Sequence, residues 1–556
     1  MTTQLSAFQA SVNQGWNKAP YAVNWSPHLS TAESSQYLQL LAPNYYTNTV
    51  LTELQELQAT GAKAVTVHID FPILYQPFYT YEKESTDYEQ FVAFYQQLAS
   101  DVHARGMKMV VEATVMEALD GTNGADFDPY YKSLDWNEYM AARAQNALNV
   151  AQLIKPDYLS LICEPDSEAN NASQPTENSP SGAMQLLQTI LTTFKTAGET
   201  SVTIGAGAGS WISEFTTYLT EFSTTSLNYI DIHVYPLNNS FLMNVLTGME
   251  LIKQSGKAIG VSEAWPNKIA NDELGLLNIS TIDSRDVFSF WSPIDVAFLQ
   301  AMVDCAQYQK AAFFSPSYPA YFAAYLNYNL VGSEAPAQLL PDEFSTSSSA
   351  NGTGAFTSTG VAFSQMIVGV DKTPPVAPGA PTSTSVSSTS DTITWTPTTD
   401  NIGVAGYKIY RDGVVVAQLA APPFHDTGLT AGVTYSYNLS AFDGQGNVSG
   451  ESPTLDVTTI DLSPPSVPTS LKVTNDAENS VSLSWSASTG GGGVGGYRVL
   501  RGTSPSSLSI IDGYVPGTSY TDSYLQASTT YYYAVESYNL RGITSAPSTV
   551  IKVTTK

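Results

Sequence analysis

The sequence has few cations, and it has no long apolar run. Its 556 residues include 23 Lys and Arg against 50 Asp and Glu, a formal net charge of -27. Such a charge repels phosphate backbones and anionic lipid surfaces, so we expect neither nucleic acid nor a membrane as a partner. No stretch reaches the roughly 18 apolar residues of a membrane-spanning helix, and a soluble protein is expected.

Cysteine is also scarce. The two residues, Cys163 and Cys305, fall in different predicted elements, and a chain of this size has little need of a disulfide, so both are interpreted as free thiols. The start at Met1 lacks the basic segment and apolar run of a signal peptide. Charged residues make up only 13% of the chain, a balance common in secreted bacterial proteins. We therefore expect an extracellular protein whose signal peptide has been trimmed.

Two Pro-rich segments divide the chain. Asp-Lys-Thr-Pro-Pro begins at Asp371, and Asp-Leu-Ser-Pro-Pro begins 90 positions later at Asp461. Both are typical of linkers. Together with the length, they predict domains at residues 1–370, 375–460 and 465–556.

The two segments behind these linkers are copies of each other. Thr-Ile-Thr-Trp395 and Gly-Tyr407-Lys-Ile-Tyr in the first correspond to Ser-Leu-Ser-Trp485 and Gly-Tyr497-Arg-Val-Leu in the second. Short alternating strands at this spacing predict β-sandwiches. The Trp, the Tyr and a late Thr-Tyr-x-Tyr strand resemble fibronectin type III modules. The resemblance implies spacers or weak carbohydrate contacts without chemistry, with Trp395 and His425 as packing residues.

The first 370 residues alternate apolar strands with amphipathic helices, which predicts βα units around a parallel sheet. The expected strands are Tyr21–Trp25, Ala64–Ile69, Met107–Ala113, Tyr158–Cys163, Val202–Ala206, Tyr229–Val234, Ala258–Ser262 and Ala311–Ser315. The expected helices include Val50–Ala59, Tyr88–Ala104, Trp136–Leu153, Ala183–Ala197, Phe241–Lys253, Ile294–Gln309 and Thr357–Val368. Eight such units fit a (β/α)8 (TIM) barrel, so the predicted fold class is multidomain: an α/β barrel followed by two all-β, immunoglobulin-like sandwiches.

An open doubly wound sheet is the alternative fold. It would need a Gly-rich phosphate loop after an early strand, and none is present. The Gly cluster from Gly205 to Gly209 follows the fifth strand and lacks the acidic partner of a dinucleotide site. We interpret it as tight backbone at a strand end and expect no cofactor.

Catalytic groups of such barrels follow the strands, and two lone acids stand out there. Glu164 ends Leu-Ile-Cys-Glu-Pro, and Glu263 ends Gly-Val-Ser-Glu-Ala-Trp. A carboxylate placed there is costly unless it is paired or functional; the alternative is that either one only holds a loop. Strands four and seven face each other across a barrel mouth, so the two acids can converge on a substrate. Retaining glycoside hydrolysis needs two carboxyl groups about 5–5.5 Å apart.

These residues resemble the glycoside hydrolase superfamily called clan A. The resemblance implies that Glu164 is the acid/base and Glu263 the nucleophile. His233-Val-Tyr235 resembles the clan's His-x-Tyr, whose Tyr contacts the nucleophile and the sugar, and Trp265 follows the nucleophile as in the clan. Cys163 departs from the pattern, because the clan has Asn there, and a thiol is a weak donor to a sugar hydroxyl. No histidine is obviously paired with Cys163, so a nucleophilic thiol is not expected.

Other polar and aromatic residues end the first three strands. His68, Asp70, Glu112 and Trp25 are predicted to bind sugar hydroxyls and rings or to orient the catalytic pair, with a structural role as the alternative. His68, Asp70 and Glu112 could instead hold a metal. Metal-dependent barrel hydrolases converge several His, and this region has only four, so we expect no metal.

Aromatic side chains follow strands two, seven and eight, and rings exposed along a cleft would form subsites for a sugar chain. They are Tyr75, Phe78, Tyr79, Tyr81, Trp265, Trp291, Tyr318, Tyr321 and Phe322. The predicted function is therefore a monomeric, endo-acting retaining O-glycoside hydrolase of a β-linked polysaccharide or oligosaccharide. Two alternatives stay open: an exo-acting β-glycosidase, and a non-catalytic carbohydrate-binding or adhesive protein built on a degenerate barrel.

Overall fold

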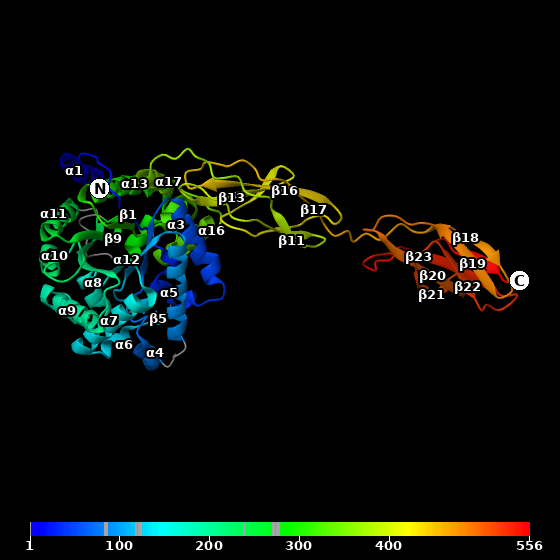
Figure 1. Ribbon diagram of the computed structural model, residues 1–556, viewed down its shortest axis with the longest axis horizontal. Helices are drawn as coiled ribbons and strands as arrows, with labels where there is room; N and C mark the ends of the chain where they lie inside the picture. The colour runs from blue at the N-terminus through cyan, green and yellow to red at the C-terminus, as the bar shows by residue number, and fades with distance from the viewer. Residues whose placement is uncertain are drawn as a thin grey trace.

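The computed structural model (Figure 1) places a mixed α/β unit at the N-terminus and two β-sandwiches behind it. It describes residues 2–82, 87–116, 119–120, 125–236, 239–269, 273 and 279–556. None of the helices within these ranges is both long enough and apolar enough to cross a bilayer.

Eight parallel strands form the sheet of the N-terminal unit, in the order β1-β10-β9-β8-β7-β6-β3-β2. The two ends of this order meet, because the backbone N–H of Leu29 donates to the carbonyl oxygen of Thr66 (2.8 Å) and that of Thr66 donates to Pro27 (3.1 Å). The sheet therefore closes into a barrel. Its strands are β1 (Asn24–Trp25), β2 (Ala64–His68), β3 (Lys108–Glu112), β6 (Tyr158–Ser160), β7 (Thr203–Gly209), β8 (Tyr229–Pro236), β9 (Ala258–Asn267) and β10 (Phe313–Pro316).

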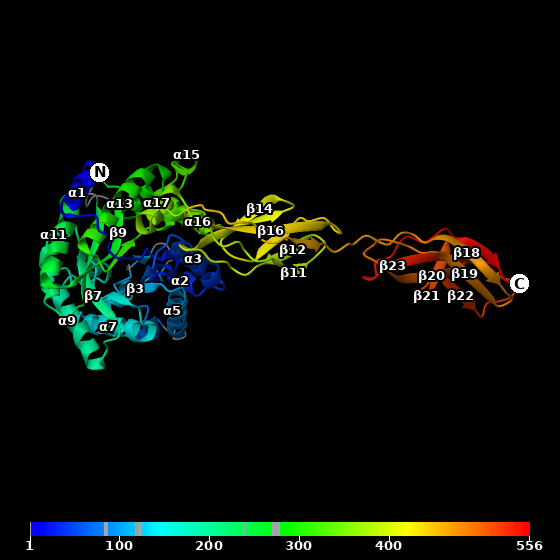
Figure 2. The ribbon, with the colours of Figure 1, turned by 45° about the horizontal axis from the view of Figure 1, so that its top comes forward.

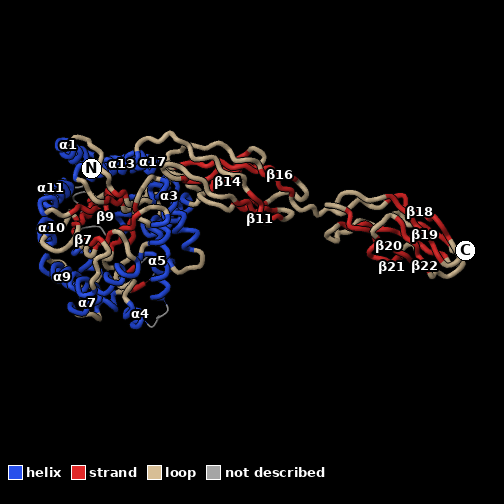
Figure 3. The backbone as a smooth tube through the Cα atoms, in the orientation of Figure 1, coloured by secondary structure: helices blue, strands red, loops and turns tan. Residues whose placement is uncertain are grey.

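Helices surround the barrel (Figures 2 and 3), and β4 (Leu119–Asp120) pairs with β5 (Ala125–Asp126) beside it. The helices are α1 (Thr2–Gly15), α2 (Tyr37–Leu40), α3 (Leu51–Ala59), α4 (Gln76–Glu82), α5 (Asp87–Ala104), α6 (Asp128–Lys132), α7 (Trp136–Asn149), α8 (Pro165–Asn171), α9 (Pro180–Ala197), α10 (Phe215–Ser223), α11 (Asn239–Ser255), α12 (Ile279–Asp286), α13 (Ser292–Gln309), α14 (Ala320–Ala323), α15 (Tyr328–Val331), α16 (Pro336–Asn351) and α17 (Ser358–Val368).

Local chemistry fixes where several helices begin and end. Asp135 caps α7 by accepting the N–H of Glu138, whose side chain accepts the N–H of Asp135 in return. Ser179 caps the start of α9, and Gly198 ends that helix in the left-handed conformation that favours glycine.

All eight predicted strands and the seven predicted helices are present, with shifted ends. The Gly cluster from Gly205 to Gly209 is misplaced, because it does not follow the fifth strand but forms the last five residues of β7. A Cβ atom on Gly205 would lie 2.2 Å from the ring of Tyr229, which fills the barrel interior together with Val110 and Phe313. The missing side chain is what lets this aromatic layer close.

Each sandwich pairs a three-stranded antiparallel sheet with a four-stranded one, in matching orders. The first contains β11 (Thr382–Val386), β12 (Ser390–Thr394), β13 (Val404–Arg411), β14 (Val414–Leu419), β15 (Phe424–Thr427), β16 (Thr434–Asp443) and β17 (Leu455–Thr458). The second contains β18 (Thr469–Asp476), β19 (Ser480–Ser486), β20 (Val494–Ser504), β21 (Ser507–Val515), β22 (Ser519–Ser523), β23 (Thr530–Asn539) and β24 (Ile551–Thr554).

The duplication seen in the sequence extends to the cores. Trp395 packs edge-on against Tyr407 with ring centroids 5.2 Å apart, and Trp485 packs against Tyr497 in the same way at 5.4 Å. Both Trp residues are buried, as the sequence predicts for packing residues.

The first sandwich contacts the barrel, while the second lies farther along the molecule beyond a short linker (Figures 1 and 2). Ala59 at the end of α3 packs with Phe356, Ala405 and Phe442. Gln55 adds a hydrogen bond from Nε2 to the carbonyl oxygen of Ala420 (2.6 Å). Residues from both units therefore share one small apolar cluster.

Candidate active site at the carboxyl ends of the barrel strands

A pocket of about 340 Å³ lies at the carboxyl ends of the barrel strands, and most of the residues around it are ionisable or polar. The lining residues are Glu33, Ser35, His68, Asp70, Glu112, Thr114, Val115, Met116, Cys163, Glu164, Ser167, Glu168, Asn171, His233 and Glu263. Seven of the ten residues that the sequence singles out for the site line this pocket, namely His68, Asp70, Glu112, Cys163, Glu164, His233 and Glu263.

The two glutamates reach the pocket from opposite sides of the barrel. Glu164 lies directly before α8, whereas Glu263 lies within β9 and not after it, because that strand runs on to Asn267. One carboxylate oxygen of each lies within 4.8 Å of the other and of a ring nitrogen of His233. Two carboxyl groups at this separation can act on the same glycosidic bond.

Glu263 is held by donors on both of its oxygens. Nε2 of His68 lies 2.8 Å from Oε1, and the hydroxyl of Tyr235 donates to Oε2. Burial alone would raise the pKa of this carboxyl group, but the nearby charge of His233 and the hydrogen bond and charge of His68 hold it well below its usual range. Glu263 is therefore an anion across the neutral pH range.

Glu164 has the opposite environment. Its pKa is raised, first because the carboxyl group is desolvated and then, more weakly, because Glu263 lies nearby; the hydrogen bond to Nδ1 of His233 (2.8 Å) acts in the other direction. Two carboxyl groups whose pKa values are driven apart by their surroundings are suited to different roles, one as an acid and one as a base or nucleophile.

Glu168, one turn into α8, fixes the backbone that carries Glu164. Its Oε1 accepts the N–H groups of Cys163 (2.8 Å) and Glu164 (3.1 Å), and its Oε2 accepts from Arg143 (2.8 Å). Arg143 is 1% exposed, so this is a buried ion pair that positions the strand end.

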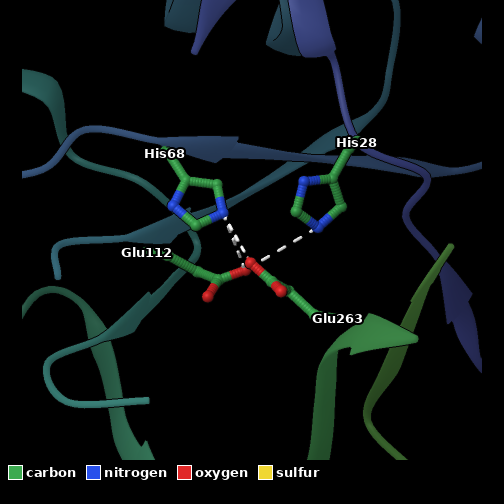
Figure 4. Close-up of side chains that lie close together, drawn as sticks. All are labelled: His28, His68, Glu112 and Glu263. Atoms are coloured by element: carbon green, nitrogen blue, oxygen red, sulfur yellow. Dashed lines mark hydrogen bonds and ion pairs between the residues drawn. The ribbon is translucent and has the colours of Figure 1, made fainter. Parts of the chain in front are cut away.

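Glu112 lines the same pocket as Glu164 and Glu263 and is completely buried. Its oxygens lie 3.2 Å from Nε2 of His233 and 3.7 Å from Nε2 of both His28 and His68, yet neither oxygen has a hydrogen-bond partner in the described structure. Figure 4 shows the carboxylates of Glu112 and Glu263 converging below the rings of His28 and His68. Cationic imidazoles at these distances would offset the cost of burying a carboxylate among them.

The hydrogen-bond partners of the imidazoles indicate which atoms carry protons. Nε2 of His28 faces the carbonyl oxygen of Ser262 (2.7 Å), which can only accept, and Nδ1 faces the carboxylate of Glu33 (2.8 Å). Burial would lower the pKa of His28, His68 and His233, but the surrounding carboxylates raise all three. We therefore interpret these side chains as imidazolium ions.

The same cluster has the spacing of a metal site. One ligand atom each from His28, His68, Glu112 and Glu263 lies within 4.8 Å of the others (Figure 4). A metal would need the lone pair on Nε2 of His28, which the bond to the Ser262 carbonyl group occupies with a proton. These donors fit a network of carboxylates and imidazolium ions better than a metal.

Asp70 lines the pocket beside His68 and orients its ring. It accepts hydrogen bonds from the hydroxyls of Ser34 (2.6 Å) and Thr114 (2.6 Å), and Nδ1 of His68 lies 3.4 Å from it. Burial alone would raise the pKa of Asp70, but His68 and the two hydroxyls lower it. Among the alternatives for Asp70, this arrangement favours orienting the site over contacting a sugar.

Cys163 has a closer histidine than the sequence indicated. Its sulfur lies within 4.8 Å of a ring nitrogen of His233 and of an oxygen of Glu112, so the expectation that no histidine accompanies it is wrong. Strand β8 delivers that ring from 70 positions away, which no local pattern reveals. Burial nevertheless raises the pKa of the thiol well above its usual value, so it stays protonated and is a poor nucleophile. Both cysteines are free thiols, as expected.

The two predicted tryptophans do not line the pocket. Trp25 is paired in register with Phe314 and packs edge-on against it in the core outside the barrel, because strand residues alternate between the two faces and Ser26 takes the inward position. Trp265 is completely buried against Tyr318, Tyr321 and Phe322. Neither ring is exposed for stacking on a sugar.

Half of the other eight aromatic residues predicted to form subsites are also packing residues. Phe78, Tyr79, Tyr321 and Phe322 are at most 3% exposed. Tyr75, Trp291 and Tyr318 are partly exposed, and Tyr81 is 47% exposed. Loop aromatics that contact one another shield their own faces, and a sequence gives no sign of those contacts.

Sequence reasoning missed several supporting residues. Asp231 is fully buried and accepts hydrogen bonds from the hydroxyls of Ser160 and Ser262 (2.6 Å for Ser262), and the latter hydroxyl lies 2.9 Å from Nε2 of His233. The sequence could have indicated Asp231, because it precedes His233 by two residues and therefore lies on the same face of β8. Glu33 lies in a loop without any such periodicity.

Comparison with known proteins finds similarity of limited extent. Residues 465–554 match the fibronectin type III domain family. Exoglucanase B of Cellulomonas fimi is 42% identical over 193 residues, which cover 34% of this chain and 17% of that protein. Chitinase A1 of Niallia circulans is 37% identical over 191 residues, covering 34% of this chain and 26% of the relative. The chain thus spans about a sixth to a quarter of the length of these relatives.

A solved structure of the chicken CNTN1 FN1–FN3 domains covers 34% of this chain and 70% of its own, with 21% identity and a TM-score of 0.18. The stretch over which this chain matches the exoglucanase, and likewise the chitinase, is about as long as the two sandwiches together. The predicted fold class, a (β/α)8 barrel followed by two fibronectin type III sandwiches, is confirmed.

Proposed function

We propose that this chain is a retaining O-glycoside hydrolase of the clan A type, with Glu164 as acid/base and Glu263 as nucleophile. The observation that carries the proposal is the pair of carboxyl groups within 4.8 Å of each other, with a raised pKa on one and a lowered pKa on the other.

The reaction has two steps in this assignment. In the first, the protonated carboxyl group of Glu164 gives its proton to the glycosidic oxygen, while Oε1 or Oε2 of Glu263 attacks the anomeric carbon and the bond to the leaving group breaks. In the second, Glu164 takes a proton from water, which attacks the same carbon and releases Glu263.

The surrounding residues keep Glu164 and Glu263 in these two different roles. Tyr235 and His68 each donate to an oxygen of Glu263 and thereby favour its anionic form before attack. His233 lies 2.8 Å from Glu164 and 3.5 Å from Glu263, so its ring sits between the two carboxyl groups. Asp70 and Glu112 hold the imidazoles in place.

The substrate that we propose is a β-linked polysaccharide outside the cell. An exoglucanase and a chitinase are among the relatives of this chain, and their names support that class of substrate. A net charge of -27 is compatible with a neutral sugar chain and disfavours polyanions. We further propose the division into residues 1–370 for catalysis and 375–460 and 465–556 as accessory modules of a monomer.

An exo-acting enzyme is the second candidate, and the packing of the aromatic residues favours it. The endo-acting mode rested on rings strung along a cleft, and five of the nine are buried within the described structure. The pocket of about 340 Å³ lies near the small end of the range of roughly 300–1,000 Å³ for ligand sites. Product sizing on β-mannan, β-glucan, xylan and galactan separates the modes, because an endo-acting enzyme releases oligosaccharides of several lengths at early times.

Substitution of the two glutamates tests the assignment. Glu263→Gln should lower kcat at least about a thousandfold, and azide should restore turnover to Glu263→Gly by replacing the lost nucleophile. Glu164→Gln should lose turnover mainly on substrates with poor leaving groups. Glu343→Gln is the matched control, because this buried glutamate lies outside the pocket and burial raises its pKa to about 8. Full activity in both catalytic variants would refute the assignment.

The non-catalytic alternative rests on Cys163, which replaces the hydrogen-bond donor expected beside the acid/base. Tight binding of a polysaccharide by the unaltered chain, without release of reducing ends over many hours, would favour that alternative over hydrolysis.

A further inference from the structure

The last residue of β7, Gly209, leaves an open volume at the mouth of the barrel. It is paired in register with His233 of the parallel strand β8. Partners in such a pair point to the same face of the sheet, and His233 lines the pocket, so a side chain at position 209 would also point toward the pocket. Because glycine has no side chain, another group can occupy this volume.

The indole ring of Trp211 occupies it. A Cβ atom on Gly209 would lie 2.4, 2.5 and 2.6 Å from three adjacent atoms of that ring, Cζ2, Cη2 and Cε2. Three nearly equal distances place this position over the flat face of the ring, because an approach from the edge would bring one atom much closer than the other two. One face of Trp211 therefore lies against the backbone of Gly209, beside His233.

Two side-chain contacts tie the Trp211 ring to the surroundings of both glutamates. Its Nε1 donates to Oδ2 of Asp166 (3.1 Å), which lies in the first turn of α8, two residues after Glu164. The ring of Tyr235, whose hydroxyl donates to Glu263, meets the indole at 60° with centroids 5.8 Å apart. The indole is thus attached on one side near Glu164 and on the other near Glu263.

The backbone before Trp211 is anchored as well. The N–H of Ser210 donates to the carbonyl oxygen of His233 (3.0 Å), and Nδ2 of Asn244 donates to the carbonyl oxygen of Ser210 (2.9 Å). Despite these contacts the side chain of Trp211 is partly exposed, whereas that of Trp265 is completely buried. The face of the indole that points away from Gly209 is the part that remains for a ligand, and we call it the free face.

The pocket itself offers little apolar surface to a sugar. Among the described residues that line it, none is Phe, Tyr or Trp, and only Val115, Met116 and Cys163 are apolar. A pyranose ring has a flat face of C–H groups as well as hydroxyls, and ligand sites usually combine a few polar groups with aromatic surface. The free face of Trp211 would supply this surface next to the charged residues.

We propose that Trp211 is a substrate-binding residue whose free face stacks on a pyranose ring of the polysaccharide, next to the glycosidic bond that is cleaved. The inference rests on the hydrolase activity proposed above and adds an apolar contact that the two glutamates cannot make. The attachments of the indole to Asp166 and Tyr235 hold the stacked sugar where both Glu164 and Glu263 can reach its glycosidic bond.

Sugar binding by the full chain with Glu263→Gln, which cannot hydrolyse its ligand, tests the proposal. Isothermal titration calorimetry with mannohexaose, cellohexaose, xylohexaose and chitohexaose identifies the sugar that binds. Adding Trp211→Ala should weaken its binding at least about tenfold, whereas Trp211→Phe keeps a ring and should lose less than about threefold. Quenching of tryptophan fluorescence by the sugar should be smaller with Trp211→Phe than without it. Gly209→Ala, whose Cβ displaces the indole, should weaken binding as Trp211→Ala does and serves if that variant fails to fold.

Trp136→Ala is the matched control and should leave binding unchanged. This indole is also partly exposed, donates from Nε1 to Gln185 (3.2 Å) and packs on Tyr139, but it lies where α7 meets α9 and not at the pocket. Unchanged affinity in the Trp211 and Gly209 variants, or an equal loss in Trp136→Ala, overturns the proposal while the hydrolase assignment stands. Failure of Glu263→Gln to bind any of the four sugars counts against the proposed hydrolase itself, and the role of Trp211 falls with it.

Discussion

Histidine side chains offset part of the negative charge in the candidate active-site pocket. Five pocket carboxyl groups, those of Glu33, Asp70, Glu112, Glu164 and Glu263, are within reach of three imidazoles. An imidazolium ion, unlike the guanidinium ion of arginine, can lose its charge as the pH rises, so the ionisation of Glu263, the proposed nucleophile, is linked to that of its neighbours. Their buried common partner is Glu112.

Replacement of Glu112 should therefore disturb the histidines before anything else. Glu112→Gln removes a negative charge 3.2 Å from His233 and 3.7 Å from His68 and should lower the raised pKa of both imidazoles. We expect kcat to fall at least about tenfold because Glu263 then loses part of its cationic environment. Imidazole NMR titration measures the two pKa values directly.

The stability of the variant should also depend on pH with a defined sign. A histidine whose pKa is raised on folding stabilises the native state fully below its unfolded value of about 6.5, and that stabilisation is lost as the pH rises through the folded value. In Glu112→Gln the stabilisation should be smaller, and its loss should be complete at a lower pH than in the unaltered protein. Unchanged histidine titration in the variant would show that Glu112 only fills space.

Particular residues show how far the sequence predicts the site. The sequence singles out Glu164 and Glu263, which both line the pocket, because each is a lone acid after an apolar run, a local contrast that needs no tertiary information. Trp25 could not be placed, because β1 contains only two residues and a one-position shift reverses the face. The proximity of Cys163 and His233 depends on barrel closure and leaves no mark on either segment.

At the level of elements, the periodicity of apolar residues predicted every strand and the main helices of the barrel. The glycine-rich segment was the exception, because glycine has no side chain to show such a period. The cluster from Gly205 to Gly209 was expected to follow the fifth strand, but it lies within β7, although glycine is unfavourable within strands. Its actual role is complementary to β8: the ring of Tyr229 occupies the volume that a side chain on Gly205 would take. A pairwise fit between strands cannot be read from either strand alone.

Gly205→Ala should therefore destabilise the barrel. The added Cβ would lie 2.2 Å from the Tyr229 ring, whose neighbour Phe313 is also fully buried and cannot yield. We expect the free energy of unfolding of the barrel to fall by about 1–3 kcal/mol, the usual cost of overpacking a core. Urea denaturation followed by tryptophan fluorescence measures it. Gly379→Ala is the control, because nothing lies within 4 Å of its added Cβ; an equal loss there would rule out the packing explanation.

At the scale of the whole molecule, the two sandwiches are alike in fold but unlike in their attachment. The first shares an apolar cluster with the barrel through Ala59 and Phe442 and forms side-chain hydrogen bonds across the junction. The second follows a linker that begins at Asp461 (Figures 1 and 2). The sequence predicted both modules from one repeated pattern and gave no sign of this difference, because the contact surface lies on the barrel helices.

Two truncated chains test whether the two sandwiches contribute differently to the stability of the barrel. A chain that ends at residue 460 should keep the melting temperature of the barrel and its turnover of soluble substrate, because only the second sandwich is lost.

A chain that ends at residue 370 exposes Ala59 and Phe356. The barrel should therefore lose about 1–3 kcal/mol of stability, the value of burying one large apolar side chain. Its kcat should stay unchanged, because the pocket lies within the barrel. Differential scanning calorimetry of the three chains resolves the barrel transition. Equal barrel stability in all three would show that the first sandwich is a spacer like the second, and a loss of kcat in the shorter chain would place part of the catalytic machinery outside the barrel.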